Sequence, residues 1–227
     1  MNNYIELKNL SKTFFEKKGV NVLKKINFKF KLGKIYSLMG PSGSGKSTLL
    51  NIISLIDKPS AGSIKFQDNY IDFNNNQKND IFRAGNIGII YQQDNLLSDF
   101  TALENVYLAS LSAGDEKKVA INKAKYILKK VGLSNRLNHY PNELSGGEKQ
   151  RVSISRALIN EPKIILADEP TGSLDKKTSL EIFRLLKKQL NRKRLIIFAT
   201  HNRFLANKSD CLLEIVDGNI KSTNVRV

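Results

Sequence analysis

The stretch GPSGSGKS, residues 40–47, decides the fold of this chain. It matches the pattern G-x-x-x-x-G-K-[S/T], in which glycines allow backbone N–H groups to turn inward around phosphate oxygens. The apolar run 34–39 before it predicts a buried strand, and residues 47–56 after it predict a helix. We therefore expect a phosphate-binding loop, rather than an ordinary glycine-rich turn, formed by Gly40, Pro41, Ser42, Gly43, Ser44, Gly45, Lys46, Ser47 and Thr48.

A second apolar run, residues 163–167, ends in Asp168 and Glu169. Open α/β sheets bind ligands at the carboxyl ends of their strands, so both carboxylates are expected beside a bound nucleotide. Asp168 would bind the shell of a Mg²⁺ ion that Ser47 ligates, and Glu169 would orient or deprotonate the attacking water. Lys46 would reach the β- and γ-phosphates. Alone, the run also fits a simple turn; with the phosphate-binding loop it predicts hydrolysis of ATP or GTP.

Residues 144–148 read Leu-Ser-Gly-Gly-Glu and open a predicted helix. Ser145 and Glu148 have the spacing of a capping box, so one interpretation is a well-capped helix and nothing more. Gly146 and Gly147 also expose backbone amides at a helix N-terminus, which is a second potential phosphate site. Because one nucleotide does not easily need two such sites from one chain, the pair predicts a head-to-tail dimer with ATP held between two protomers.

Two kinds of hydrophobic pattern divide the chain. Apolar and polar residues alternate along 5–8 and 26–30, which predicts half-buried antiparallel strands, whereas residues 101–160 repeat apolar positions at helical spacing. Strands return at 163–167 and 195–199. The order predicts an α/β core with an N-terminal antiparallel β subdomain and an inserted α-helical subdomain. We expect a single domain, 1–227, with residues 1–92 and 161–227 forming the core and β subdomain and residues 93–160 the helical insert.

The chain is strongly basic, with 37 Lys and Arg against 21 Asp and Glu and a formal net charge of +16. Most of the excess lies in residues 1–34 and 187–208. Such a charge fits a nucleic-acid partner or a solvated lysine-rich surface, and we favour the surface. One cysteine, Cys211, excludes an internal disulfide, and no apolar stretch reaches the roughly 18–20 residues of a membrane span. We therefore expect a cytoplasmic protein.

The motifs, in order, closely resemble those of the ATP-binding-cassette (ABC) ATPases over essentially the whole chain: GPSGSGKST, Gln92, LSGGEKQR, ILADEP, SLD and a late ATH. The resemblance implies a P-loop NTPase core that uses ATP and Mg²⁺ and works as a homodimer. It implies that Phe14 stacks on the nucleobase, where tyrosine is commoner. Catalysis would depend on Glu169, His201, Gln92 and Lys46, and Mg²⁺ would contact Ser47, Gln92 and Asp168. The remaining implied nucleotide contacts are the signature residues Ser145, Gly146 and Gly147, which reach the partner protomer's γ-phosphate, and the D-loop residue Asp175.

A sharper resemblance lies in residues 90–106, which read IYQQDNLLSDFTALENV, and in NHYPNELSGGE. These stretches are most similar to the lipoprotein-releasing ATPases, a branch shared with macrolide-type efflux and cell-division ATPases. The resemblance implies two ATPase subunits beneath two integral-membrane subunits at the cytoplasmic face of the inner membrane. Gln93 replaces a more usual aromatic residue, and Ser155 stands where alanine is commoner; Gln93 lies beside the loop that couples to the membrane partner.

Three other functions remain open at this point. An efflux or cell-division ATPase of the same branch would carry the same motifs. A nucleic-acid-associated ABC ATPase would suit the charge, but such relatives typically carry two cassettes, a coiled-coil insertion or zinc modules, and we expect no nucleic acid. An inactive regulatory cassette is disfavoured because every expected catalytic position is filled.

Overall fold

The computed structural model describes residues 3–14 and 19–225. The chain forms two compact units: unit 1 comprises Met1–Asp80 and Leu190–Val227, and unit 2 comprises Ile81–Gln189. The boundary falls within α2 (Asn76–Asn86), a helix that the sequence analysis did not predict. The domain limits at residues 92/93 and 160/161 stay a prediction, and the units are described in turn.

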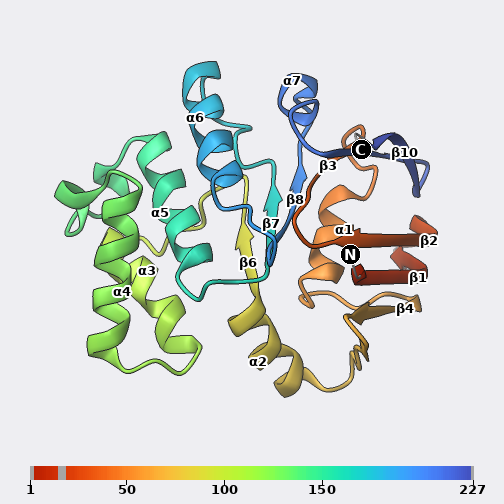
Figure 1. Ribbon diagram of the computed structural model, residues 1–227, viewed down its shortest axis with the longest axis horizontal. Coiled ribbons are helices and arrows are strands. Elements are labelled where there is room, and N and C mark those ends of the chain that lie inside the picture. Colours follow the sequence, from red (N-terminus) through yellow and green to blue (C-terminus); the bar gives the residue numbers. More distant parts are fainter. Residues whose placement is uncertain (1–2, 15–18, 226–227) are drawn as a thin grey trace. The chain divides into compact units, whose positions relative to one another are not determined.

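Unit 1 contains an antiparallel sheet with the strand order β2-β1-β4-β5 (Figure 1). Its strands are β1 (Asn3–Phe14), β2 (Val20–Lys31), β4 (Ala61–Phe66) and β5 (Asn69–Tyr70). Leu7 of the central strand β1 lies opposite Phe28 on one side and Ile64 on the other. Because alternate residues of a strand share a face, the sheet buries one apolar face, formed largely by Ile5, Leu7, Leu10, Phe30 and Ile64.

Two irregular positions interrupt β1 and β2, which are therefore longer than the alternating stretches that predicted them. Asn9 and Lys25 have left-handed backbone, with φ of 49° and 48°, and the register shifts between Leu7 and Leu10. The Asn27 side chain bridges the two sites: it donates to Lys25 O (2.9 Å) and Asn9 Oδ1 (3.0 Å) and accepts from Asn9 N (2.9 Å). A bulge interrupts the alternation of apolar and polar residues along a strand, so this alternation predicts only part of each strand.

A second sheet region of unit 1 has the strand order β10-β9-β3-β8. Strand β3 (Ile35–Met39) runs parallel to both β8 (Leu195–Ala199) and β9 (Cys211–Val216), and β10 (Asn219–Val225) pairs antiparallel with β9. All five residues of β8 are buried, which confirms the predicted strand at 195–199. The helix α1 (Lys46–Ile53) follows β3, and α7 (Arg203–Ala206) follows β8.

An aromatic cluster packs β2 against β3 within unit 1. Phe28, Phe30 and Tyr36 meet edge to face, with ring centroids 4.7–6.0 Å apart. The Tyr36 hydroxyl accepts a hydrogen bond from Lys31 N (3.0 Å), and burial raises the pKa of Tyr36 to about 12. The phenol therefore stays neutral and keeps the two strands together.

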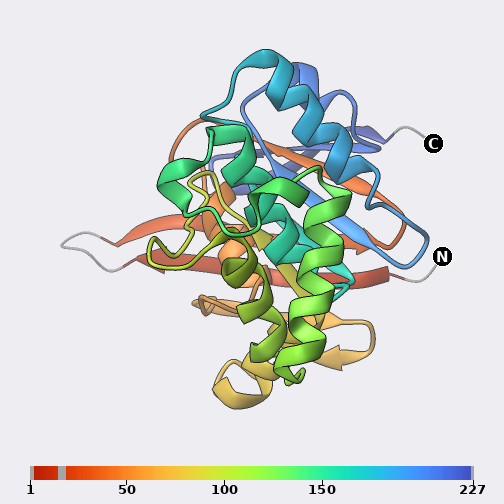
Figure 2. The ribbon, with the colours of Figure 1, turned by 90° about the vertical axis from the view of Figure 1, so that its left-hand side faces the viewer.

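Unit 2 combines two parallel strands, β6 (Ile87–Ile90) and β7 (Ile164–Asp168), with four complete α-helices and two short 3-10 helices, Ser134–Arg136 and Pro141–Glu143. The α-helices are α3 (Ala102–Ser112), α4 (Lys117–Lys130), α5 (Gly146–Leu158) and α6 (Lys176–Lys187). In Figure 2, α3 and α4 run side by side. Helices α3, α4 and α5 share one apolar core. Its buried residues include Ala102, Val106, Ala124, Leu128, Val131, Leu133, Leu144, Val152 and Ile159.

Two helices of unit 2 begin with complete capping boxes. Thr101 Oγ1 accepts from Glu104 N (3.3 Å), and the Glu104 carboxylate accepts from Thr101 N (2.8 Å). Ser145 and Glu148 make the same reciprocal pair at α5, at 3.3 and 2.9 Å, which confirms the predicted capping box. Arg136 Nε also donates to Glu148 Oε1 (2.8 Å).

The described helices are all too short or too polar to cross a bilayer. The longest, α4, has 14 residues.

Gly88 of β6 leaves no room for a side chain against helix α5. A Cβ on Gly88 would lie 2.2 Å from the backbone oxygen of Ala157 in α5. We expect Gly88→Ala to lower the free energy of unfolding by about 1–3 kcal/mol, because the strand and helix must separate. Gly85→Ala is the matched control: its Cβ meets nothing within 4 Å, and alanine favours the helix. Equal effects of both variants in urea unfolding would contradict this account.

Glu148 has the most strongly shifted carboxylate pKa of the described helix caps. The hydrogen bond from Arg136, followed by that from Ser145 N, lowers the Glu148 pKa from 4.5 to about 2. Its contribution to stability is therefore complete above pH 4.5 and is lost as the pH falls towards 2. NMR titration of the Glu148 carboxyl checks the value. We expect Arg136→Ala to move this pKa back towards 4.5; an unchanged midpoint would show that the arginine is not the main cause.

Candidate nucleotide-binding site

The loop between β3 and α1 has a backbone that only glycine adopts readily. Gly40 has φ of 154°, and a Cβ there would lie 2.6 Å from Ile215 O and from Ser44 Oγ. Gly45 has φ of 102°, and its Cβ would lie 2.8 Å from Leu23 Cδ2. The glycines therefore allow the chain to turn tightly beside β9 and β2.

Helix α1 begins without a side-chain cap. Gly45 at the N-cap has no side chain, and the first turn carries no acidic residue, so its N–H groups and dipole favour an anion. The buried ammonium of Lys46 donates to Gly40 O (2.9 Å) and Pro41 O (3.1 Å). Ser44 Oγ is buried and has no hydrogen-bond partner among the described residues. The uncapped N–H groups of α1, the ammonium of Lys46 and the unpartnered hydroxyl of Ser44 together fit a chain of phosphate groups.

His201 begins its loop at the same edge of unit 1 as the phosphate-binding loop. Leu38 and Ala199 are paired in the parallel ladder between β3 and β8, and Thr200 N donates to Leu38 O (3.0 Å). Two residues beyond this pair, the chain reaches His201 after β8 and Gly40 after β3. His201, which is exposed, therefore follows β8 at the edge of the sheet where the phosphate-binding loop follows β3.

Phe14 ends β1 and is 41% exposed. The ammonium of Lys12 lies 4.9 Å from the centroid of its ring. An exposed ring of this kind can stack on a flat base. The nucleobase role of Phe14 remains a prediction.

Gln92 and the Asp168–Glu169 pair lie at the same edge of unit 2. Strands β6 and β7 are parallel neighbours in register, so the chain leaves both at one edge. Glu169 has φ of 47°, and its backbone oxygen accepts a hydrogen bond from Gly172 N (2.9 Å), which makes a tight turn after β7. Gln92 reaches this turn, because a Cβ on Gly172 would lie 3.0 Å from Gln92 Nε2.

Asp168 is the residue of unit 2 best suited to a cation. Its Oδ1 is buried and has no hydrogen-bond partner among the described residues. Such an oxygen is costly to desolvate unless a donor or a cation meets it. Proteins usually hold Mg²⁺ through one or two carboxylates together with substrate phosphates, so a single carboxylate of this kind fits that ion.

Helix α5 holds the loop after Gln92 through contacts that the sequence analysis missed. Gln150 Nε2 donates to Tyr91 O (3.3 Å), and the Arg156 guanidinium donates to Asp94 O and Asn95 O, each at 2.7 Å. Burial lowers the pKa of Arg156, with Asp94 opposing that shift. Side-chain bonds to backbone oxygens leave no motif, so only the fold reveals them.

The remaining predicted contacts lie around the N-termini of α5 and α6. Ser145 and Gly146 are exposed, and a Cβ on Gly147 would lie 2.9 Å from Thr178 Cγ2. Asp175 is the N-cap of α6 and accepts from Lys177 N (2.9 Å) and Thr178 N (3.0 Å). The hydrogen bond from Thr178 is the main cause of its lowered pKa. Asp175 thus shapes the turn before α6, and its predicted nucleotide role remains a prediction.

Known proteins match the whole chain. The sequence profile of the ABC transporter family matches residues 23–172. The lipoprotein-releasing system ATP-binding protein LolD of Rickettsia conorii is 49% identical over 218 residues, which cover 95% of this chain and 96% of the relative. The protein of the same name from Wigglesworthia glossinidia brevipalpis is 44% identical and covers 99% of this chain and 100% of its own length.

A solved structure extends the match to three dimensions. It is described as a dimeric structure of a post-hydrolysis state of the ATP-binding cassette MJ0796 bound to ADP and Pi. It is 37% identical, has a TM-score of 0.90, and the match covers 98% of this chain and 99% of that one. The match confirms the predicted fold class, an α/β cassette with an antiparallel β subdomain and an inserted helical part. The chain belongs to the ABC transporter family and is an ATP-hydrolysing subunit that powers transport.

Proposed function

We propose that this chain is the ATPase subunit of a lipoprotein-releasing transporter and works as a homodimer beneath two integral-membrane subunits. The observation that carries the proposal is the 44–49% identity, over nearly full length, to relatives named for lipoprotein release. These relatives do not favour the efflux and cell-division alternatives. We place the ATPase at the cytoplasmic face of the inner membrane, held there by its partners.

The phosphate-binding loop supplies the binding energy in this proposal. The phosphates of ATP would displace the Lys46 ammonium from the carbonyls of Gly40 and Pro41 and accept hydrogen bonds from the first turn of α1. Ser47, at the start of that helix, would ligate Mg²⁺. The unpartnered Oδ1 of Asp168 would accept a hydrogen bond from the water shell of the ion. Mg²⁺ would neutralise the charge that develops on the phosphates.

Hydrolysis would need a base and a group that senses the γ-phosphate. Glu169 would orient or deprotonate the attacking water, and the turn that fixes its backbone supports this role. Gln92 and His201 would contact the γ-phosphate. Ser145 and the glycines after it would bind the γ-phosphate of the partner protomer, as the exposed amide end of α5 permits.

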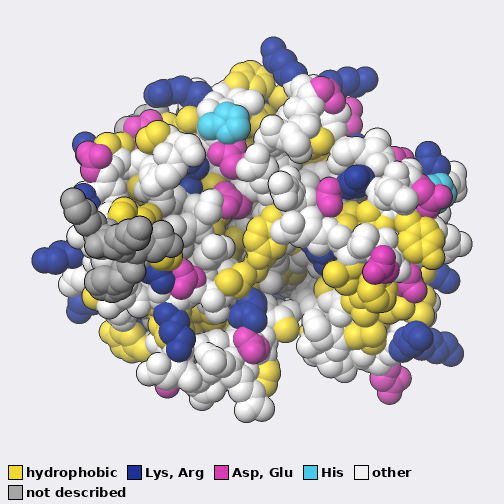
Figure 3. Space-filling model, turned by 180° about the vertical axis from the view of Figure 1, so that it is seen from behind, with side chains coloured by type: hydrophobic (Ala, Val, Ile, Leu, Met, Phe, Trp, Pro, Cys, Tyr) yellow, Lys and Arg dark blue, Asp and Glu magenta, His cyan; other side chains and the backbone are white. Residues whose placement is uncertain are grey.

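An exposed apolar surface on unit 2 is suited to a membrane subunit. Leu97, Phe100 and Tyr140 are exposed. The backbone bond from Ala102 N to His139 O (2.8 Å) holds their two segments together. In the view of Figure 3, hydrophobic side chains gather, among charged ones, on the surface formed by unit 2. Exposed apolar patches rimmed by polar residues are typical of protein interaction sites.

Hydrogen bonds from one buried side chain hold the backbone of this surface in place. Asn105, which is buried, accepts from Leu97 N (2.8 Å) and donates to the backbone oxygens of Leu97, Phe100 and Thr101 at 2.9–3.1 Å. The turn is therefore shaped before a partner arrives, which lowers the entropy lost on binding. We propose that a cytoplasmic helix of the membrane subunit docks here.

Glu169→Gln tests the proposed chemistry. We expect ATP binding to persist, ATPase turnover to fall at least about a hundredfold, and a nucleotide-dependent dimer to accumulate, because the base is removed while the charge-binding groups remain. Glu116→Gln is the control, since Glu116 is exposed and makes no side-chain cap to α4. Phosphate release and size-exclusion chromatography with ATP provide the measurements. Normal turnover in Glu169→Gln would remove this residue from the mechanism.

Phe100→Ser tests the proposed docking surface. We expect co-purification with the co-expressed membrane subunits to fall about tenfold, because an exposed aromatic side chain that the partner would cover is lost, while the thermal unfolding temperature stays unchanged. Tyr126→Ser removes an aromatic residue of α4 that is more exposed than Phe100, 62% against 38%, and should leave co-purification intact. Equal retention of the membrane subunits by both variants would place the docking surface elsewhere.

A further inference from the structure

Lys12 is an unusually well-anchored lysine that precedes Phe14 by two residues on β1. Residues two apart on a strand share a face, so the Lys12 side chain runs past the Phe14 ring, with Nζ 4.9 Å from its centroid. The Lys12 side chain is only 12% exposed. Most lysines keep their ammonium in water, so a buried one needs specific partners.

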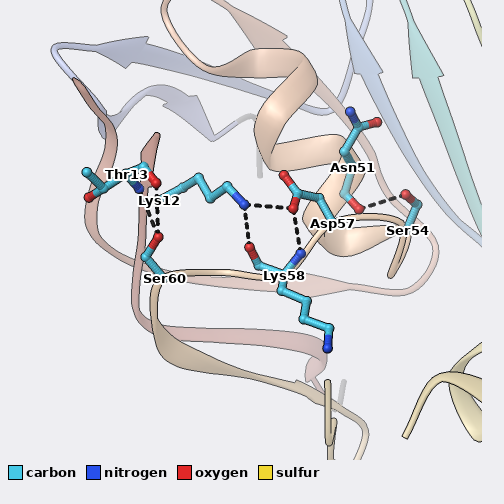
Figure 4. Close-up of polar contacts among 7 residues, drawn as sticks. All are labelled: Lys12, Thr13, Asn51, Ser54, Asp57, Lys58 and Ser60. Carbon is cyan, nitrogen blue, oxygen red and sulfur yellow. Dashed lines mark hydrogen bonds and ion pairs between the residues drawn. The ribbon is translucent and has the colours of Figure 1, made fainter. Parts of the chain in front are cut away.

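The ammonium of Lys12 is fixed at the far end of the phosphate-loop helix. It donates to Asp57 Oδ1 and to the backbone oxygen of Lys58, each at 2.7 Å (Figure 4). Both acceptors lie just after α1, whose first turn contains Lys46. Lys12 therefore ties the strand that carries Phe14 to the helix that begins at the phosphate-binding loop.

Two hydrogen bonds reinforce this tie. Thr13 N donates to Ser60 Oγ (3.0 Å), and Ser60 N donates to Ser11 O (2.8 Å). Figure 4 shows Ser60 facing Thr13 on one side of Lys12 and Asp57 on the other. The end of β1 is thus held on both sides, so the direction of the Phe14 ring depends on this turn.

We infer that Lys12 is a positioning residue for the nucleobase: it covers one face of the Phe14 ring and leaves the opposite face for the base of ATP. A cation on one face also draws ring electrons towards it, which favours stacking of an electron-rich purine on the other. The inference rests on the proposed role of Phe14. It predicts that Lys12 affects binding of the base and not binding of the phosphates.

The experiment measures equilibrium binding of ATP and of inorganic tripolyphosphate in the Glu169→Gln background, which prevents turnover. We expect Lys12→Met to weaken ATP binding about three- to fivefold and to leave tripolyphosphate binding unchanged. Lys12→Arg should restore ATP affinity, because arginine keeps both the ion pair and the cation over the ring. Lys29→Met is the matched control: it removes another ion pair to β1, Lys29–Glu6, whose lysine side chain is 53% exposed, and should not change ATP affinity.

A double-mutant cycle with Phe14→Ala separates this inference from the proposed function. If Lys12 acts through the ring, Lys12→Met should have no further effect once Phe14 is alanine. A loss that persists in Phe14→Ala, or that also appears with tripolyphosphate, would overturn the positioning role. Normal ATP affinity in Phe14→Ala alone would refute the base contact itself. Asp57→Asn provides a second variant that keeps the lysine but loosens its anchor; unchanged ATP affinity there would also count against the inference.

Discussion

The buried ammonium of Lys46 is the constraint on which the rest of the site depends. A cation taken out of water needs oxygen partners, and here the carbonyls of Gly40 and Pro41 provide them. Those carbonyls point inward only because the loop follows a path that glycine permits. The loop in turn needs a straight buried strand before it and a helix after it. The parallel strands, the tight turn and α1 together hold one positive charge ready for an anion.

Helix α1 begins at Gly45 without a side-chain cap, and α4 begins at Glu116 without one. The N-termini of α3, α5 and α6 are satisfied by Thr101, Ser145 and Asp175, whereas α1 has no side-chain cap. In a capped helix, side chains of the same chain accept hydrogen bonds from the first N–H groups. In an uncapped helix at a glycine turn, these N–H groups can donate to a ligand instead. The α5 capping box uses two amides but leaves Ser145 and Gly146 exposed. One end of α5 can thus be both well capped and available to a partner.

The sequence alone predicted the elements whose residues obey a simple period or motif. The run at 195–199 became β8, and Ser145 with Glu148 formed the expected capping box. Helix α2 was missed because its mostly polar residues bury only Asn79, and β1 was underestimated because Asn9 breaks the alternation. The same principle explains the site. Residues in motifs could be named in advance, but the contacts of Arg156, and that of Lys12 with Lys58 O, run to backbone oxygens that carry no residue identity.

The hydrogen bonds from Arg156 to the loop after Gln92 limit how that loop can move. The Arg156 guanidinium is partly desolvated and donates to two successive carbonyls, so a small displacement of that loop would lengthen two short charge-assisted bonds together. Stretching them gradually is costly at every intermediate position, whereas releasing both at once lets water solvate the cation. A displacement of this loop would therefore break both bonds together.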